Sequence, residues 1–195
     1  MMRAITKLTG YLVVGAMLLA PAGLTAQEVY IEDGKIIFDM TVAAGMPDGA
    51  QTSTSKGTHG AGLNTSAANW FVYEKLEIAP QDMTDSGAGF GTGSVLINWT
   101  TANARCQGLT HNGNSNWRIP TLRELTMIWI FRDAIETFSG NTFSSGSNEY
   151  YWSATPREIN TTFHIAFATG YMNVSFNSSG NVHYARCVRE VPVTP

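Results

Sequence analysis

Two cysteines, Cys106 and Cys187, constrain the fold of this chain more than any other feature of its 195 residues. A disulfide between them would close a loop of about 80 residues and, by chain entropy, add about 3–4 kcal/mol to the free energy of unfolding. We expect this disulfide because the chain starts like an exported protein, and disulfides persist in oxidising compartments. The alternatives are two buried free thiols and a catalytic cysteine, although no His, Asp or Arg lies near either cysteine in an activating pattern.

The first 26 residues have the pattern of a secretory signal peptide. Arg3 and Lys7 form a positive start, residues 11–20 form a short apolar run, and small residues precede Gln27. The run is shorter than a membrane span requires, and a retained anchor is the alternative. We therefore expect a chain that crosses the periplasm of a Gram-negative-type bacterium and is secreted or displayed on the outer surface, with no lasting membrane span.

Charge is sparse in this chain. Charged residues make up 14% of it, against about a quarter in an average soluble protein, which disfavours a helical bundle or coiled coil. Without Arg3 and Lys7, 10 basic residues face 15 acidic ones, a net charge of −5. That balance, together with export, excludes a nucleic-acid-binding protein.

The first half of the mature chain predicts strands separated by polar loops. Residues 35–42 and 70–73 have strand composition, and the second strand extends towards Ile78. Residues 43–67 and 80–94 are rich in small residues and predict loops.

Two short helices follow. The first covers residues 102–107, with Thr100 or Thr101 as its N-cap and Gly108 as a left-handed stop. The second begins at a capping box, in which the side chains of Thr121 and Glu124 each bind the other residue's amide. Its apolar residues recur at helical spacing: Leu122, Leu125, Ile128 and Trp129.

The last third predicts an antiparallel meander with one apolar and one polar face. Residues 162–167 and 171–176 alternate around a two-residue turn at Thr169-Gly170, and residues 182–188 form the last strand. On the polar face, beside Thr162, we expect the ligand-binding residues: His164, Tyr171, Asn173, Ser175, Asn177 and His183. Such side chains combine contact area with hydrogen bonding, as in antibody binding sites. Loop 141–160 would extend this surface; an ordinary solvated sheet face is the alternative.

Four spaced motifs resemble one family: Trp99 with Ala102 and Cys106; residues 117–121 with Glu124 and Leu125; residues 151–154; and residues 185–189. The chain is similar to the Lcl C-terminal domain, the C-terminal domain of the Legionella collagen-like adhesin, within the C-type-lectin-like group. This resemblance implies an α+β fold with two short helices packed on twisted antiparallel β-sheet and stapled by a disulfide. It implies a structural framework made of Trp117, Arg118, Pro120, Thr121, Glu124, Trp152, Arg186 and Arg189, in which the arginines pair with Glu124 or cap the sheet.

The resemblance also implies a domain organisation. Residues 1–26 are the signal, residues 27–67 an N-terminal strand with a flexible Gly/Ser/Thr-rich segment, residues 68–190 the Lcl C-terminal-like domain, and residues 191–195 a tail.

The function implied is attachment, which in this family includes binding of sulfated polysaccharides. A net negative charge suits a sulfated ligand poorly. The sequence contains no collagen-like Gly-X-Y run, so a trimer is not implied. We expect a non-catalytic adhesion module that recognises an extracellular glycan or surface protein. One alternative is a structural or tip subunit of a fimbria-like appendage, in which strand 35–42 pairs with a neighbouring subunit; another is an enzyme of unknown type.

No cofactor or metal is expected. The Glu-Pro-Asn, Gln-Pro-Asp and Trp-Asn-Asp strings of calcium-dependent lectins do not occur, and the four histidines lack metal-ligand spacing. The sequence contains no G-x-S-x-G or phosphate-loop motif, and its string Gly87-Ala88-Gly89-Phe90-Gly91 lies in loop sequence.

Overall fold

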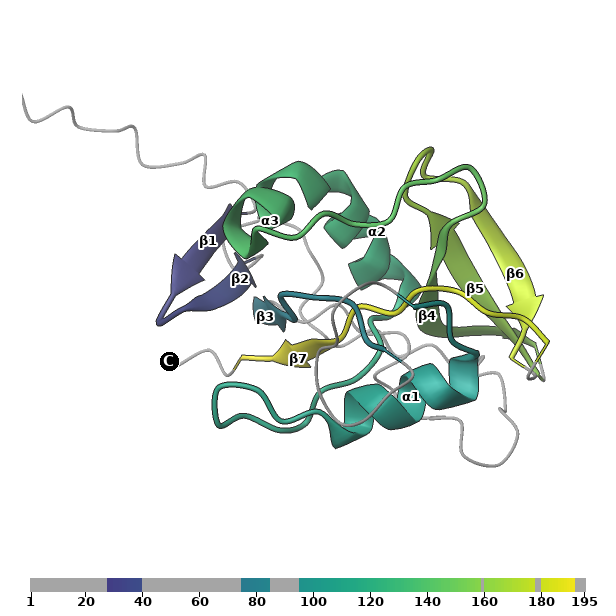
Figure 1. Cartoon of the computed structure of the whole chain (residues 1–195), viewed down its shortest axis with the longest axis horizontal. Coiled ribbons are helices and arrows are strands. Elements are labelled where there is room, and N and C mark those ends of the chain that lie inside the picture. The colour runs from purple at the N-terminus through teal and green to yellow at the C-terminus, as the bar shows by residue number, and fades with distance from the viewer. Residues whose placement is uncertain (1–27, 40–74, 85–94, 159, 178–179, 192–195) are drawn as a thin grey trace, which may run out of the picture.

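The computed structural model of the chain describes residues 28–39, 75–84, 95–158, 160–177 and 180–191. Within these residues the fold is α+β, as the sequence predicts, with three helices and two antiparallel sheets of order β1-β2-β3-β7 and β4-β5-β6 (Figure 1). In chain order the elements are β1 (Glu28–Glu32), β2 (Lys35–Asp39), β3 (Lys75–Ile78), α1 (Trp99–Gly108), α2 (Leu122–Ile130), α3 (Arg132–Ser139), β4 (Tyr150–Glu158), β5 (Thr161–Ala166), β6 (Met172–Phe176) and β7 (Val188–Glu190). The predicted signal, residues 1–26, and the predicted loop 43–67 lie outside the described residues.

The first sheet contains the N-terminal hairpin. β1 turns into β2 at Asp33-Gly34, where both residues have positive φ; Asp-Gly is favoured in a two-residue type I′ turn. β2 pairs with β1 on one side and β3 on the other. The predicted strand 35–42 is confirmed over residues 35–39, whereas residues 40–42 and 70–73 lie outside the described part of the chain.

The start of α1 differs from the prediction. The N-cap is Asn98, whose side-chain oxygen accepts the Thr101 N–H (2.8 Å), so Thr100 and Thr101 are not caps. Asn is at least as good a cap as Thr. Capping at Asn98 also places Trp99 in the first turn, where its side chain is buried.

Two other helix boundaries were not predicted. Gly108 is not a left-handed stop; Leu109, in an extended conformation, ends α1. α3 is a third helix beyond the two expected: it follows α2 directly at Phe131, without a side-chain cap, and ends at Gly140, whose φ is 65°. Its sequence carries little signal, because it has no capping residue and Ile135 is its one buried residue.

The capping box of α2 is confirmed. The Thr121 hydroxyl accepts the Glu124 N–H, and the Glu124 carboxylate accepts the Thr121 N–H (2.8 Å). The same buried carboxylate accepts two N–H groups of Arg118, each at 2.7 Å. A bidentate arginine satisfies a carboxylate better than a single donor does, so the chain before α2 is held firmly to its first turn.

The predicted hairpin of β5 and β6 is confirmed, with Ile165 opposite Met172. Its connection has four residues, 167–170, and not two, because the Ala166 N–H donates to the Tyr171 carbonyl (2.9 Å). Gly170 closes the turn at φ 75°, and a Cβ there would lie 2.5 Å from the Trp129 ring. Glycine is thus required for both backbone conformation and space.

A single C-terminal segment, residues 183–190, connects the two sheets (Figure 1). The predicted strand 182–188 is wrong in its bounds: β7 begins at Val188, and before it His183 and Tyr184 form isolated bridges to Ile97 and Tyr151. The segment changes partner too often to form one regular strand.

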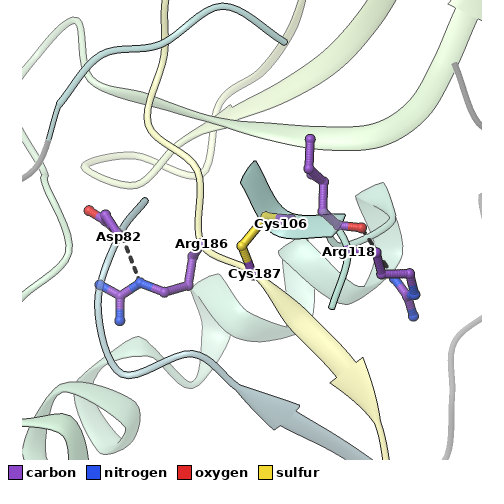
Figure 2. Close-up of a disulfide and its surroundings, with 6 residues drawn as sticks. Asp82, Cys106, Arg118, Arg186 and Cys187 are labelled. Atoms are coloured by element: carbon purple, nitrogen blue, oxygen red, sulfur yellow. Dashed lines mark hydrogen bonds and ion pairs between the residues drawn. A yellow bond between two sulfur atoms is a disulfide. The ribbon is translucent and has the colours of Figure 1, made fainter. Parts of the chain in front are cut away.

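Consecutive side chains of this segment anchor it on opposite sides (Figure 2). Cys187 forms the predicted disulfide with Cys106 of α1, with Cα atoms 5.5 Å apart. Arg186 points the other way, and its Nε–H donates to Asp82 Oδ1 (2.6 Å). Both side chains of this ion pair are 1% exposed. The Tyr151 O–H donates to the second Asp82 oxygen (2.7 Å).

Removing the charge of Asp82 should destabilise the protein strongly. D82N leaves the buried Arg186 guanidinium without its counterion, and breaking a buried ion pair costs about 3–5 kcal/mol of the free energy of unfolding. The matched control is D133N, which breaks the exposed Arg132–Asp133 contact and should cost less than about 1 kcal/mol. Denaturant unfolding of both variants measures the difference; equal, small losses would contradict a structural role for the Arg186–Asp82 pair.

Candidate binding surface

Burial divides the six predicted ligand-binding residues. Tyr171, 58% exposed, and Asn173 reach solvent, and Ser175 and His183 are half-buried. His164 and Asn177 are only 2% and 7% exposed. The structure thus brings the exposed members together on the β5–β6 hairpin.

The expectation of a solvated polar face is wrong for β5. Thr162 and His164 are buried, because β5 is the middle strand of its sheet and the C-terminal segment returns over this face. His164 lies opposite Trp152 of β4 and Asn173 of β6. The His183 ring lies 4.4 Å from the His164 ring. The alternation of apolar and polar residues within the hairpin cannot predict that a later segment, with His183, covers its polar face.

Four rings form an aromatic cluster over this face: Tyr150, Trp152, His164 and His183. Burial lowers the pKa of His164 to about 4. Burial, and then the neighbouring His164, lower the pKa of His183 to about 3. Both imidazoles are therefore neutral at pH 7, and His183 Nε2 shares a hydrogen bond with Ser175 Oγ (3.1 Å).

Three buried polar atoms have no hydrogen-bond partner within the described part of the chain: Thr162 Oγ1, His164 Nδ1 and Asn177 Nδ2. They belong to β5 and to the residue that follows β6. The hairpin therefore has buried as well as exposed polar atoms that could form further hydrogen bonds.

The exposed part of the hairpin is apolar as well as polar. We call it the hairpin surface, and its members are Tyr171, Met172, Asn173 and Phe176. Phe176 is 61% and Met172 44% exposed, although alternation assigned both to the core. No Asp, Glu, Lys or Arg occurs between Glu158 and Arg186. Exposed apolar side chains with little charge around them are typical of interaction sites. The absence of charge is the signal in the sequence that could have predicted the exposure of Met172 and Phe176.

The residues assigned to the framework are buried or ion-paired. Besides Arg118 and Arg186, Arg189 pairs with the buried Glu77, and the Trp152 indole N–H donates to the Ile97 carbonyl (2.8 Å). The remaining members are all buried: Trp117, Pro120, Thr121, Glu124 and Trp152. The buried carboxylates of this framework are thus bound to arginines and other internal donors.

The described ranges hold neither a metal-ligand cluster nor a membrane-spanning helix. No three His, Cys, Asp or Glu side chains there lie close enough together to hold a metal ion. None of the helices formed by the described residues is long and apolar enough to cross a membrane.

A family model described as the Lcl C-terminal domain matches residues 64–189. None of the curated proteins compared with the chain matches it. The matched range contains both cysteines and the whole β5–β6 hairpin, and it begins after β2.

The two histidines of the aromatic cluster should make stability depend on pH. In the unfolded chain they protonate near pH 6.5, whereas in the folded chain they stay neutral down to about pH 4 and 3. Their contribution is therefore present above pH 6.5 and is lost as the pH falls, by up to about 1.4 kcal/mol per pH unit for each imidazole.

Denaturant unfolding between pH 7 and about 5, above most carboxylate titration, measures this slope. We expect a shallower slope in the double variant H164N/H183N, whatever its absolute stability. An identical slope in the two proteins would contradict burial of neutral imidazoles.

Proposed function

Because the chain belongs to the Lcl C-terminal domain family, we propose that it is an adhesin-like, non-catalytic binding module that is secreted or displayed on the cell surface. The observation that carries the proposal is the hairpin surface: exposed, uncharged and held by a disulfide-stapled framework. In this proposal residues 1–26 direct export, residues 68–190 form the binding domain on a C-type-lectin-like scaffold, residues 27–67 contribute β1 and β2 to its first sheet, and residues 191–195 are a tail.

The chemistry of the hairpin surface favours an uncharged partner, either a neutral glycan or a protein surface. Tyr171 offers an aromatic ring that can lie against the apolar side of a sugar or side chain. Asn173 offers an amide that can donate and accept hydrogen bonds. A sulfated ligand would need clustered Lys and Arg, and the hairpin surface has none.

The rival function, a subunit of a fimbria-like appendage, depended on strand 35–42 pairing with a neighbouring chain. β2 already has hydrogen-bonded neighbours on both sides within its own chain, with Phe38 opposite both Val29 and Leu76. Exchange between subunits would have to break these pairings first. This observation supports the binding module over the appendage subunit.

Substituting exposed hairpin residues should remove binding without unfolding the protein. A screen of oxidised residues 27–195 against a glycan array and surface proteins identifies the partner. We expect Y171A and N173A each to weaken its binding by about tenfold or more, as at an interface hot spot, and to shift Tm by no more than about 2–3 °C, since surface substitutions have small effects.

The matched control is F138A, which truncates an aromatic side chain of similar exposure, 42%, on α3. Its affinity should equal that of the wild type. Unchanged affinity in Y171A and N173A, or equal loss in F138A, would contradict the proposed surface.

A further inference from the structure

The outer edge of β6 carries backbone groups that point away from β5, its neighbouring strand among the described residues. The Ala166 N–H donates to the Tyr171 carbonyl and the Asn177 N–H to the Asn160 carbonyl, both at 2.9 Å. In an antiparallel pair, hydrogen-bonded residues alternate with non-hydrogen-bonded ones, so Asn173 and Ser175 also bond to β5. Met172, Val174 and Phe176 therefore direct their N–H and C=O groups away from the sheet.

The side chain of Asn173 supports this assignment. Its Oδ1 accepts the Val174 N–H (2.8 Å), which is possible because that N–H does not bond to β5. A side-chain oxygen thus occupies a position that a neighbouring strand's carbonyl could take.

The other described sheet edges are protected. β1 carries Glu28 and Glu32 at its ends, and charged residues discourage pairing along an edge. The outer edge of β4 is covered, because the Trp152 N–H donates to the Tyr184 carbonyl (2.9 Å) and the Ala154 N–H to the Pro120 carbonyl (2.7 Å). β7 has three residues, and its Val188 bridges to Arg118. β6 is longer than β7 and, unlike β1, has no charged residue; Met172 and Phe176 are exposed at its ends.

We propose that β6 is a self-association strand: it pairs antiparallel with β6 of a second copy, across a two-fold axis at Val174, and joins two three-stranded sheets into one of six. In this register Val174 faces Val174 of the other copy, and Met172 faces Phe176. All three residues with outward backbone groups then form hydrogen-bonded pairs, and Val174 exchanges its bond to Asn173 for a backbone bond. The apolar side chains form cross-strand contacts on one face, as a two-fold interface requires.

Charge favours a second copy as the occupant. Residues 27–195 have a formal net charge of −5, so two copies repel each other, but this repulsion is weakest where residues 159–185 contain no charged side chain. A strand recognised through acidic or basic side chains would find no counterion on β6. β6 of a second copy is an uncharged strand, and it matches β6 in register as well.

Such a dimer would also place two hairpin surfaces on one continuous sheet. Asn173 of one copy would lie opposite Ser175 and diagonally next to Asn173 of the other, on the face that carries the polar side chains. Two adjacent sites bind a repetitive glycan or surface more strongly than one. The self-association itself does not depend on the proposed function, since it follows from the strand edge alone.

The test is a charge exchange at the two-fold axis. Analytical ultracentrifugation of oxidised residues 27–195 should show concentration-dependent dimers. V174K and V174E should each associate at least about tenfold more weakly, because like charges then face each other, and an equimolar mixture of the two should recover the dimer. The matched control is V182K, which adds the same charge at an exposed valine outside β6 and should still dimerise.

Amide hydrogen exchange of the wild-type chain provides a readout that needs no variant. The Met172, Val174 and Phe176 amides should gain protection as the protein concentration rises, while the Val29 and Ile31 amides, which face outwards at the β1 edge, should not. A monomer at millimolar concentration, a dimer that survives in V174K, a mixture that stays monomeric, or protection confined to β1 would each overturn the proposal.

Discussion

The structure depends on how residues 183–190 are held. His183 and Tyr184 bridge to the loop before α1 and to β4, and the Ala185 carbonyl accepts the Met83 N–H (2.8 Å). Arg186 and Cys187 then anchor the segment by an ion pair on one side and a disulfide on the other. Because each residue contacts a different element, this short segment keeps both sheets and α1 in one arrangement. This arrangement also holds the hairpin surface in place, because Tyr184 bridges to β4 and β4 pairs with β5 of the hairpin.

Features encoded by neighbouring residues could be predicted from the sequence. The capping box at Thr121 and Glu124 and the β5–β6 hairpin depend on short-range signals, and the disulfide followed from two cysteines in a chain that looked exported. Features decided by tertiary contacts could not. Asn98 caps α1 in place of a threonine because Trp99 is buried behind it, and α3 forms against β1 and β2 without a capping signal of its own.

The candidate site shows the same division. Tyr171 and Asn173 were predicted to be exposed, and they lie in or beside β6, which has no described neighbour on its outer side. His164 has a similar local pattern, yet His183 and Trp152 cover it. For Met172 and Phe176 the prediction is wrong in the opposite sense. Their apolar character predicts the core, but both are exposed because β6 extends beyond the layer that α2 covers. The burial of a strand residue depends on the position of its strand in the sheet as well as on alternation.

The N-terminal hairpin has a practical consequence for anyone who produces this domain. The family match begins at residue 64, after β2, yet β2 pairs with β3 and its Phe38 packs against Phe131 of the helical layer. A recombinant fragment cut at the start of the match would lack β1 and β2, and β3 would then present an unpaired edge beside uncovered Leu76 and Ile78. Such fragments tend to aggregate through that edge. The boundary set by sequence similarity is therefore not the boundary of the folding unit.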